Sequence, residues 1–394
     1  MDASSVRPGH SAGIEAFTYG LLNGLAPGPH ELAVQILSGT GDEWRERVPS
    51  SRVGWAEVRP ALRADNRIGQ LLRRHAPRAA VTSIALRRTV NLVRQWNRPR
   101  AAGVDVTVYP FAAVPVHSDP AVIVLHDLRQ LDPQLGSPGF REVIQRNVAR
   151  AAAVVVSWPH PYEQALRAFP AARDKTAMIP LPVFHAADGR STAAHEPGLL
   201  VFPSSTAPLK NHRTLLDAMA LLPECRLVCP GPLVEPEASN LRARAEQPDL
   251  RGRVSFPGFV TTDELAALYA RAAAVVVPSL WEAASGAMLE AFSWGIPVVC
   301  ADSAPLLAQL EFTRADAGVF PARDPDGLAA AVRRVLTRRE HYASSSRAAG
   351  RLLSGRTWQD TADDYVAVLE WVRAGRPGPM PRSSFAADVN SAAR

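Results

Sequence analysis

Two glutamates, Glu282 and Glu290, stand eight positions apart around a turn that could bind a phosphate group. Glu282 is expected in the loop that follows an apolar strand, and Glu290 in the first turns of the next helix. Ser285, Gly286 and Ala287 mark the start of that helix, where free backbone N–H groups and the helix dipole favour an anion. Two carboxylates beside such a turn suit a ligand with both hydroxyl groups and phosphates, as in a nucleotide sugar. Acids at this spacing also arise by chance as solvated charges, so the interpretation depends on the flanking strand and on Gly286.

Lys210 is a candidate for binding the same phosphates. Only two of the 44 lysine and arginine residues are lysines, Lys175 and Lys210. A lysine in such an arginine-rich chain indicates a need for a compact, mobile ammonium group, which a planar guanidinium does not replace at a phosphate. Lys175 lies in a connection and is expected to be solvent-exposed, so scarcity alone does not indicate function. His212, close to Lys210, is expected on the surface of a helix.

Length and composition indicate a two-domain protein. The chain has 394 residues, of which 47% are hydrophobic, enough for two domains with separate cores. No apolar run approaches the ~18 residues that a membrane span needs, and the N-terminus lacks the apolar segment of a signal peptide, so a cytoplasmic protein is expected. Cys225, Cys229 and Cys300 lie in apolar contexts without the paired spacing of a zinc site or a disulfide framework. They are expected to be buried thiols.

The positive charge of the chain is concentrated between residues 61 and 100. This stretch holds ten arginines and one acid, Asp65, in a chain whose formal net charge is +6. Leu, Ile and Val are interleaved with arginine at helical spacing, which predicts one or two basic amphipathic helices. A solvated face, attraction to an anionic acceptor or phospholipid surface, and nucleic-acid binding all stay open as explanations. Because no aromatic platform or nucleic-acid module accompanies the charge, no nucleic-acid partner is expected.

The second half of the chain alternates short apolar runs with amphipathic helical stretches. Strands this apolar, separated by helices, indicate a parallel sheet covered on both faces. The expected strands are 198–203, 225–231, 254–258, 272–279, 296–301 and 317–320. The expected helices are 211–222, 237–247, 263–271, 286–294, 304–310 and 326–337. This pattern is typical of a Rossmann-like domain.

The first half is similar but less regular. Its expected strands are 31–37, 104–110, 121–127, 151–157 and 176–182, and its expected helices follow Gly13 and cover 138–150 and 160–169. Two doubly wound α/β domains in series are therefore predicted. Ligands bind at the carboxyl ends of the strands in such folds, so a ligand cleft between the two domains is expected.

Domain boundaries follow from the loss of apolar periodicity. We expect an N-terminal domain over residues 1–185, a linker over 186–197 and a nucleotide-sugar-binding domain over 198–355. A helix over 356–375 is expected to pack back on the N-terminal domain. The remaining residues, 376–394, have the composition of a disordered tail.

Five motifs together resemble the retaining glycosyltransferases of family 4. The run PSLWEAASGAMLEAFSWGIPVV resembles the family's E-x7-E signature. The other four, in the family's order, are AGIEAFTYGLLNGLA (12–26), LHDL (125–128), PLKNHRTLLDAMALL (208–222) and VSFPGFVTTDELAALYARA (254–272). The resemblance implies the GT-B fold, in which two Rossmann-like doubly wound domains face a central cleft, and a reaction that needs no metal and no cofactor.

The resemblance also implies roles for the residues of the second half. Lys210 would stabilise the charge on the donor diphosphate, Glu290 would hold the ribose hydroxyls, and Glu282 would hydrogen-bond sugar hydroxyls. The backbone amides of Ser285, Gly286 and Ala287 would receive the diphosphate. Further donor-binding residues are Ser205, Asn211, Phe259 and Val260, the last two bordering the base. Ser205 stands where family members often carry a second phosphate-binding arginine, which leaves Lys210 as the main side-chain cation.

Four residues of the first half are expected to border the donor or the acceptor. His126, at the end of a strand, would contact the donor sugar, and Asp127 follows it in the same motif. Gly13 and Ile14 belong to the first loop and helix, where glycine allows a close approach to the ligand. The opening MDASSV resembles the segment just after the family's first strand, so we expect a wrongly assigned start rather than a missing strand.

The sequence therefore predicts a retaining glycosyltransferase that moves a sugar from a nucleoside diphosphate sugar to an acceptor hydroxyl. A polysaccharide, a glycolipid or a natural-product intermediate would supply this hydroxyl. Residues 61–100 would contact the acceptor or an anionic membrane, placing the protein at the inner face of the membrane. The alternatives are another GT-B enzyme, such as a nucleotide-sugar epimerase or a phosphorylase, and a non-catalytic protein that binds anionic surfaces.

Overall fold

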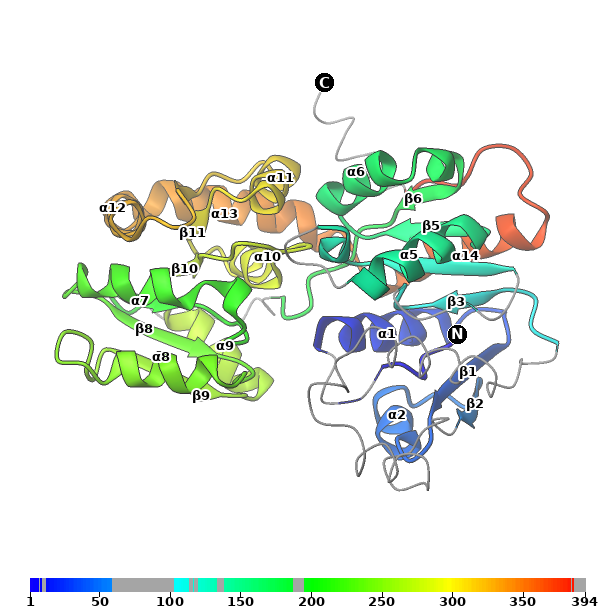
Figure 1. Ribbon diagram of the computed structural model, residues 1–394, viewed down its shortest axis with the longest axis horizontal. Helices are drawn as coiled ribbons and strands as arrows, with labels where there is room; N and C mark the ends of the chain where they lie inside the picture. Colours follow the sequence, from blue (N-terminus) through cyan, green and yellow to red (C-terminus); the bar gives the residue numbers. More distant parts are fainter. Residues whose placement is uncertain are drawn as a thin grey trace. The chain divides into compact units, whose positions relative to one another are not determined.

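The computed structural model describes two compact units of the chain (Figure 1). The described residues are 1–6, 8, 12–58, 103–112, 116, 120–132, 138–186, 195–383 and 385. Unit 1 comprises Met1–Leu181 with Thr357–Arg394, and unit 2 comprises Pro182–Arg356. The division falls before the expected linker. The basic helices expected within 61–100 and the end of the expected tail lie outside the described residues.

Unit 2 is built on one parallel six-stranded sheet with the order β12-β11-β10-β7-β8-β9. Its strands are β7 (Leu199–Val201), β8 (Arg226–Pro230), β9 (Val254–Gly258), β10 (Ala274–Val277), β11 (Val298–Ala301) and β12 (Gly318–Phe320). Strands β7, β10 and β11 are buried along their whole length, as expected for a sheet covered on both faces. Each lies within an apolar run predicted as a strand, so the Rossmann-like prediction for this half is confirmed.

Three of the described helices of unit 2 begin at a side-chain cap. The described helices of this unit are η3 (Pro208–Lys210), α7 (His212–Ala220), α8 (Glu237–Ala245), α9 (Thr262–Arg271), α10 (Gly286–Ser293), α11 (Ala304–Thr313), α12 (Pro325–Thr337) and α13 (Arg339–Ser354). Thr261 and Glu264 form a capping box at α9, and Ser285 and Asp324 cap α10 and α12.

Helix α13 was not predicted, because small residues make up much of its buried face. Ala343, Ser346, Ala349 and Gly350 are all buried, which leaves little apolar periodicity in the sequence. A Cβ atom on Gly350 would lie 2.3 Å from the carbonyl oxygen of Phe292 in α10. The absence of a side chain at Gly350 therefore lets α13 pack directly against α10.

Unit 1 contains two parallel sheets. One pairs β1 (Leu32–Leu37) with β2 (Val53–Val58), and the other has the order β3 (Thr107–Tyr109), β4 (Ala121–Leu125), β5 (Ala153–Val156) and β6 (Thr176–Met178). Residues Met1 to Ala3 hydrogen-bond to both sheets: the Asp2 N–H donates to the Val108 carbonyl, and the Ala3 N–H donates to the Gln35 carbonyl. The chain's first residues thus connect the two sheets.

The described helices of unit 1 are α1 (Ala12–Leu25), α2 (Gly41–Arg47), η1 (Arg129–Leu131), α5 (Pro138–Arg150), α6 (Pro159–Ala168), η2 (Pro170–Lys175) and α14 (Trp358–Arg373). Neither α2 nor β2 was predicted from the sequence, since α2 is short and strongly charged and β2 mixes buried with exposed positions. No helix in these described parts of the chain combines the length and apolar character needed to cross a membrane.

Two expectations about basic residues are wrong. His212 is only 2% exposed, with its ring between those of Phe202 and Phe256, so it is a core residue rather than a surface residue. Lys175 is partly buried, and its ammonium group donates to the carbonyls of Ala149 and Ala151 at the end of α5. Both outcomes depend on neighbours that are distant along the chain. The expectation of buried thiols is confirmed, since all three cysteines are buried.

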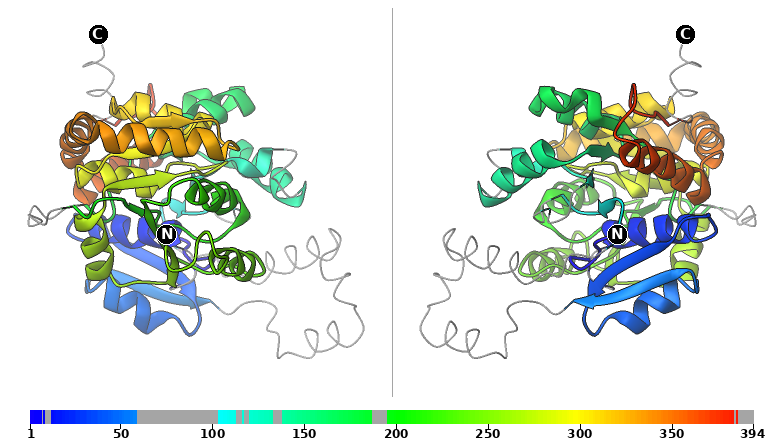
Figure 2. Two further views of the ribbon diagram at one scale, coloured as in Figure 1. Left: turned by 90° about the vertical axis from the view of Figure 1, so that its left-hand side faces the viewer. Right: turned by 90° about the vertical axis from the view of Figure 1, so that its right-hand side faces the viewer.

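Helix α14, which lies just before the C-terminal end of the chain, packs against α1 (Figure 2). Two glycines of α1 face Trp358. A Cβ atom on Gly24 would lie 2.4 Å from the Trp358 carbonyl oxygen, and one on Gly20 would overlap the Trp358 indole. The two helices therefore approach more closely than side chains at these positions would allow.

We predict that Gly24→Ala lowers the free energy of unfolding of unit 1 by about 1–3 kcal/mol, because the added methyl group meets a backbone oxygen that cannot rotate away. The matched control is Gly13→Ala in the same helix, where no atom lies within 4 Å of an added Cβ. The control should leave stability unchanged or raise it by up to ~1 kcal/mol, since alanine favours a helix over glycine. Chemical denaturation compares the two variants, and equal effects would contradict the packing argument.

Candidate functional site

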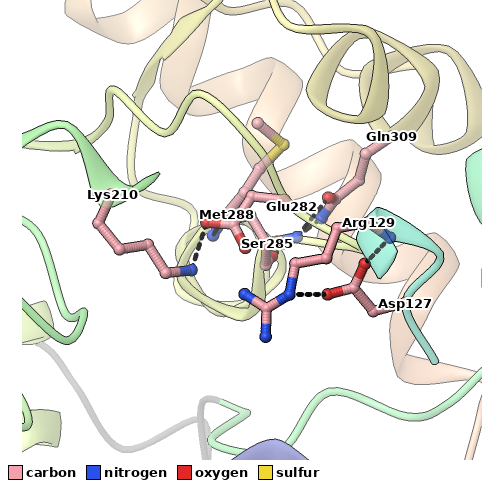
Figure 3. A network of polar contacts seen from close by, with 7 residues as sticks. All are labelled: Asp127, Arg129, Lys210, Glu282, Ser285, Met288 and Gln309. Carbon is pink, nitrogen blue, oxygen red and sulfur yellow. Dashed lines mark hydrogen bonds and ion pairs between the residues drawn. The ribbon is translucent and has the colours of Figure 1, made fainter. Parts of the chain in front are cut away.

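Lys210 and Glu282 meet at the carboxyl ends of two adjacent strands. Lys210 ends η3, which follows β7, and Glu282 lies in the loop that follows β10. The strand order of the sheet reverses between β7 and β10, which is where open α/β folds bind ligands. The Lys210 Nζ lies 2.6 Å from Glu282 Oε1, and the two side chains are 27% and 9% exposed (Figure 3). The structure thus brings together two predicted site residues that are 72 positions apart.

Asn211 holds the Lys210 loop in place. Its backbone is in the left-handed region, at φ 59° and ψ 36°, which asparagine tolerates better than most residues. Its Nδ2 donates to the Pro278 carbonyl at 3.0 Å and to the Ala322 carbonyl at 2.6 Å. These bonds use both N–H groups of the side-chain amide, and its Oδ1 accepts the Thr214 hydroxyl, so the Asn211 side chain is committed to contacts within unit 2.

The start of α10 is fixed by Ser285 and Gln309. The Ser285 Oγ accepts the Met288 N–H at 3.3 Å. The Ser285 N–H donates to Gln309 Oε1 at 2.8 Å, and Gln309 Nε2 donates to the Ser285 carbonyl at 3.0 Å (Figure 3). The Ser285 amide is therefore occupied. Gly286 and Ala287, at the first two helical positions, have N–H groups that the helix itself cannot satisfy, and these remain suited to an anion.

Glu290 is a buried carboxylate on α10. It is 6% exposed, and the Tyr269 hydroxyl donates to its Oε2 at 2.5 Å. Burial raises the pKa of Glu290 to about 7, although the hydrogen bonds from Tyr269 and from the His185 backbone favour the ionised form. The Trp294 ring stacks against Tyr269 and donates its Nε1–H to the His185 carbonyl. Glu290 is thus held from α9 and from the segment that opens unit 2.

Three further predicted donor-binding residues lie after the carboxyl ends of β7 and β9. Phe259 is 74% exposed and directly follows Gly258, whose φ of +81° turns the chain at the end of β9. Val260 and Ser205 are partly exposed. The Phe259 ring is therefore accessible to a ligand.

The remaining predicted residues belong to unit 1. His126 follows β4, with its ring 4.5 Å from that of Phe17. Burial lowers the pKa of His126 to about 4, so the ring is neutral at pH 7. Its ring bonds the Pro110 carbonyl, while Nε2 is covered and has no hydrogen-bond partner among the described residues. A neutral ring that donates to a carbonyl through Nδ1 leaves Nε2 as an acceptor.

Asp127, Gly13 and Ile14 are the other predicted residues of unit 1, and they differ in their contacts within the unit. Asp127 Oδ1 accepts the Arg129 N–H at 2.7 Å, and Oδ2 lies 3.1 Å from the Arg129 Nε. Gly13 is exposed near the start of α1, whereas Ile14 packs against the hydrophobic core of unit 1. Within the described ranges, no cluster of three or more His, Cys, Asp or Glu side chains is arranged to hold a metal ion.

Gln309 and Tyr269 are site residues that the sequence analysis missed. Gln309 is the one uncharged amide in the otherwise largely apolar helix APLLAQLEFT, a signal that could have marked it. Tyr269 lies within a predicted motif but carries no signal of its contact with Glu290. Both contacts join residues more than 20 positions apart.

We predict that the stability of the unliganded protein depends on the ionisation of Glu290. The folded-state pKa of about 7 lies above the usual 4.5, so the folded state holds this proton more tightly than the unfolded state. The contribution of the Glu290 proton to the free energy of unfolding is complete below pH 4.5. It is lost as the pH rises through 7, by roughly 3 kcal/mol in total. Glu290→Gln lacks this dependence. Its free energy of unfolding, measured by denaturation from pH 5 to pH 8, should rise relative to that of the unmodified protein, and a pH-independent difference would contradict the assignment.

Comparison with known proteins matches the second half of the chain to glycosyl transferases. Residues 186–351 match the family model described as Glycosyl transferases group 1. The chain is 34% identical over 138 residues to O-antigen chain mannosyltransferase B of Escherichia coli, covering 34% of this chain and 35% of that protein. It is 31% identical over 180 residues to glycogen synthase of Mycobacterium tuberculosis, covering 44% and 43%. The chain thus spans less than half the length of these curated relatives.

A solved structure is similar over nearly the whole chain. The Anabaena protein HepE, crystallised with UDP and glucose, has a TM-score of 0.68 and 17% identity, covering 94% of this chain and 98% of that one. At this identity the similarity establishes the fold. The chain therefore has the GT-B fold, and residues 186–351 match the glycosyl transferases group 1 model.

Proposed function

We propose that this protein is a retaining glycosyltransferase that moves a sugar from a nucleoside diphosphate sugar to an acceptor hydroxyl. The observation that carries the proposal is the Lys210–Glu282 pair, held 2.6 Å apart where the strand order reverses and next to the start of α10. A cation, a carboxylate and a helix N-terminus at one edge of the sheet match the phosphates and hydroxyls of such a donor.

The diphosphate would bind to the N–H groups of Gly286 and Ala287 and to the Lys210 ammonium. Ser205 stands five positions before the lysine and carries no charge, so Lys210 supplies the side-chain cation there. As the bond to the sugar breaks, negative charge grows on the leaving diphosphate. A fixed cation and aligned amides stabilise that charge more in the transition state than in the ground state, which accelerates the reaction. The proposed reaction uses no metal and no cofactor.

The two glutamates would orient the hydroxyl groups of the donor. Glu282, paired with Lys210 in the unliganded protein, would accept hydrogen bonds from the sugar. Glu290 would accept them from the ribose through Oε1, which lies 3.9 Å from the position of a Cβ on Gly286 and hence beside the phosphate-binding turn. Phe259 would border the base. In unit 1, the neutral His126 would accept a hydrogen bond from the donor sugar through Nε2.

The relatives favour a hexose donor. The two curated relatives are named as a mannosyltransferase and a glycogen synthase, and the similar solved structure contains UDP and glucose. A polysaccharide, a glycolipid or a natural-product intermediate is proposed as the acceptor. The basic segment 61–100 would contact an anionic acceptor or a membrane surface, which agrees with a cytoplasmic protein at the inner face of the membrane.

Binding and turnover of Lys210 variants test the proposed donor site. Isothermal calorimetry against UDP, GDP and dTDP should identify one tight nucleotide. Lys210→Ala should weaken its binding by about tenfold or more and reduce transfer by ~10²-fold or more, because the diphosphate loses its side-chain cation. Lys210→Arg should also cost activity, since a guanidinium does not occupy the place of a compact ammonium.

A matched control removes a neighbouring cation that is outside the site. Arg213 lies three positions after Lys210 and pairs with Glu237 through two hydrogen bonds of 2.6 and 2.8 Å. Arg213→Ala should therefore leave nucleotide binding nearly unchanged. Binding of no nucleotide by the unmodified protein would rule out the proposal and favour a protein that binds anionic surfaces. Phosphate-dependent or hydrolytic turnover without a transfer product would favour another GT-B enzyme.

The stereochemistry of the product tests retention. We expect the acceptor to attack from the face that the diphosphate leaves, with a donor-phosphate oxygen as the base, because the proposed roles of Glu282 and Glu290 are to bind hydroxyl groups and not to act as a nucleophile. The anomeric configuration of the glycoside product, read by NMR from its one-bond C1–H1 coupling, should be that of the donor sugar. An inverted product would exclude this mechanism.

A further inference from the structure

We propose that Gln309 is a positioning residue for the diphosphate-binding turn and that it acts through the Ser285 peptide. This inference rests on the proposed function, since it concerns the same donor site. Gln309 lies on α11 and is 3% exposed. Its side chain is aimed at the N-cap of α10 rather than at solvent (Figure 3).

The carboxamide of Gln309 satisfies both polar groups of Ser285. Its Oε1 accepts the Ser285 N–H at 2.8 Å, and its Nε2 donates to the Ser285 carbonyl at 3.0 Å. The same carbonyl accepts the Leu289 N–H, the first hydrogen bond of α10. Gln309 therefore holds the residue at which the loop becomes a helix, from a helix 24 positions further along the chain.

The position of Ser285 is important because of the loop that precedes it. The segment Glu282-Ala283-Ala284-Ser285 must carry the Glu282 carboxylate to Lys210 and also direct the N–H groups of Gly286 and Ala287 at one anion. The two alanines offer no polar side chain to fix the loop. A rotation at Ser285 would change the direction of the following amides, so donor affinity should depend on the two bonds from Gln309.

The chemistry of the contact requires one donor and one acceptor on the same side chain. An ionised glutamate at position 309 has two acceptors, so one carboxylate oxygen would face the Ser285 carbonyl without a proton between them. A protonated glutamate restores both bonds. Burial and the adjacent carbonyl raise the pKa of such a carboxyl group. The effect of Gln309→Glu should therefore depend on pH, whereas that of Gln309→Met, which has no comparable donor, should not.

The experiment measures nucleotide affinity by calorimetry from pH 5.5 to pH 8.5, with whichever of UDP, GDP and dTDP the unmodified protein binds best. Each variant is compared with the unmodified protein at the same pH, which cancels the titration of Glu290 and of the nucleotide. Gln309→Met should weaken binding by about tenfold at every pH. Gln309→Glu should weaken it by more than tenfold at pH 8.5 and recover most of that loss at pH 5.5.

A control on the same helix separates positioning from general destabilisation. The Thr313 hydroxyl is buried in α11 and donates to the Gln309 carbonyl at 2.7 Å. Thr313→Val removes this bond without touching the Ser285 contact, so it should leave nucleotide affinity unchanged even where it lowers the melting temperature. Hydrogen–deuterium exchange of the unliganded protein gives a second measurement. Amides 282–288 should exchange faster in Gln309→Met than in Thr313→Val.

The outcomes distinguish this inference from the proposed function. If the unmodified protein binds a nucleotide and Gln309→Met binds it equally well, Gln309 does not position the turn. A loss in Gln309→Glu that is the same at every pH also overturns the inference, because the proposed contact requires protonation of the carboxyl group to restore binding. If no nucleotide binds to the unmodified protein, the proposed function itself fails. Accelerated exchange in Gln309→Met without any loss of affinity would show that the contact between Gln309 and Ser285 does not affect nucleotide binding.

Discussion

The ion pair between Lys210 and Glu282 is the contact on which the rest of the candidate site depends. Parallel strands present their carboxyl ends at one edge of the sheet, and the loops after β7 and β10 are neighbours there because these two strands are adjacent, at the point where the strand order reverses. A carboxylate that is 9% exposed needs a partner, which Lys210 supplies in the unliganded protein. A donor with both hydroxyls and a diphosphate would replace this pair with charge-assisted hydrogen bonds to each member.

Buried polar side chains hold the loops around this pair. Asn211 fixes the η3 turn to the carbonyls after β10 and β12, Gln309 fixes the start of α10, and Tyr269 holds the Glu290 carboxylate. Each of them connects two elements of unit 2. Polar groups in a dry interior are costly unless satisfied, so these bonds have few alternatives and restrict each loop to one arrangement. The site is therefore largely prearranged before a donor binds.

In unit 1, the two predicted polar site residues differ in whether they are hydrogen-bonded. His126 is neutral and covered, with Nε2 lacking a partner among the described residues, whereas Asp127 is engaged by Arg129. An unsatisfied buried acceptor of this kind costs free energy. Close packing of α14 on α1 through Gly20 and Gly24 makes α14 a structural part of this unit.

The sequence by itself determined the α/β class, the Rossmann-like second half and the local motifs around Lys210, Glu282 and Glu290. Parallel strands buried on both faces are apolar runs, and a helix N-terminus is marked by its cap, so both are local properties that a sequence displays. Only the tertiary structure decided that His212 is buried, that α13 forms with a face of small residues, and that Gln309 rather than a ligand takes the Ser285 amide. These outcomes depend on contacts between residues that are far apart in the chain. The role of each residue is then set by the neighbour that it contacts in the fold, which its own type and its local sequence do not reveal.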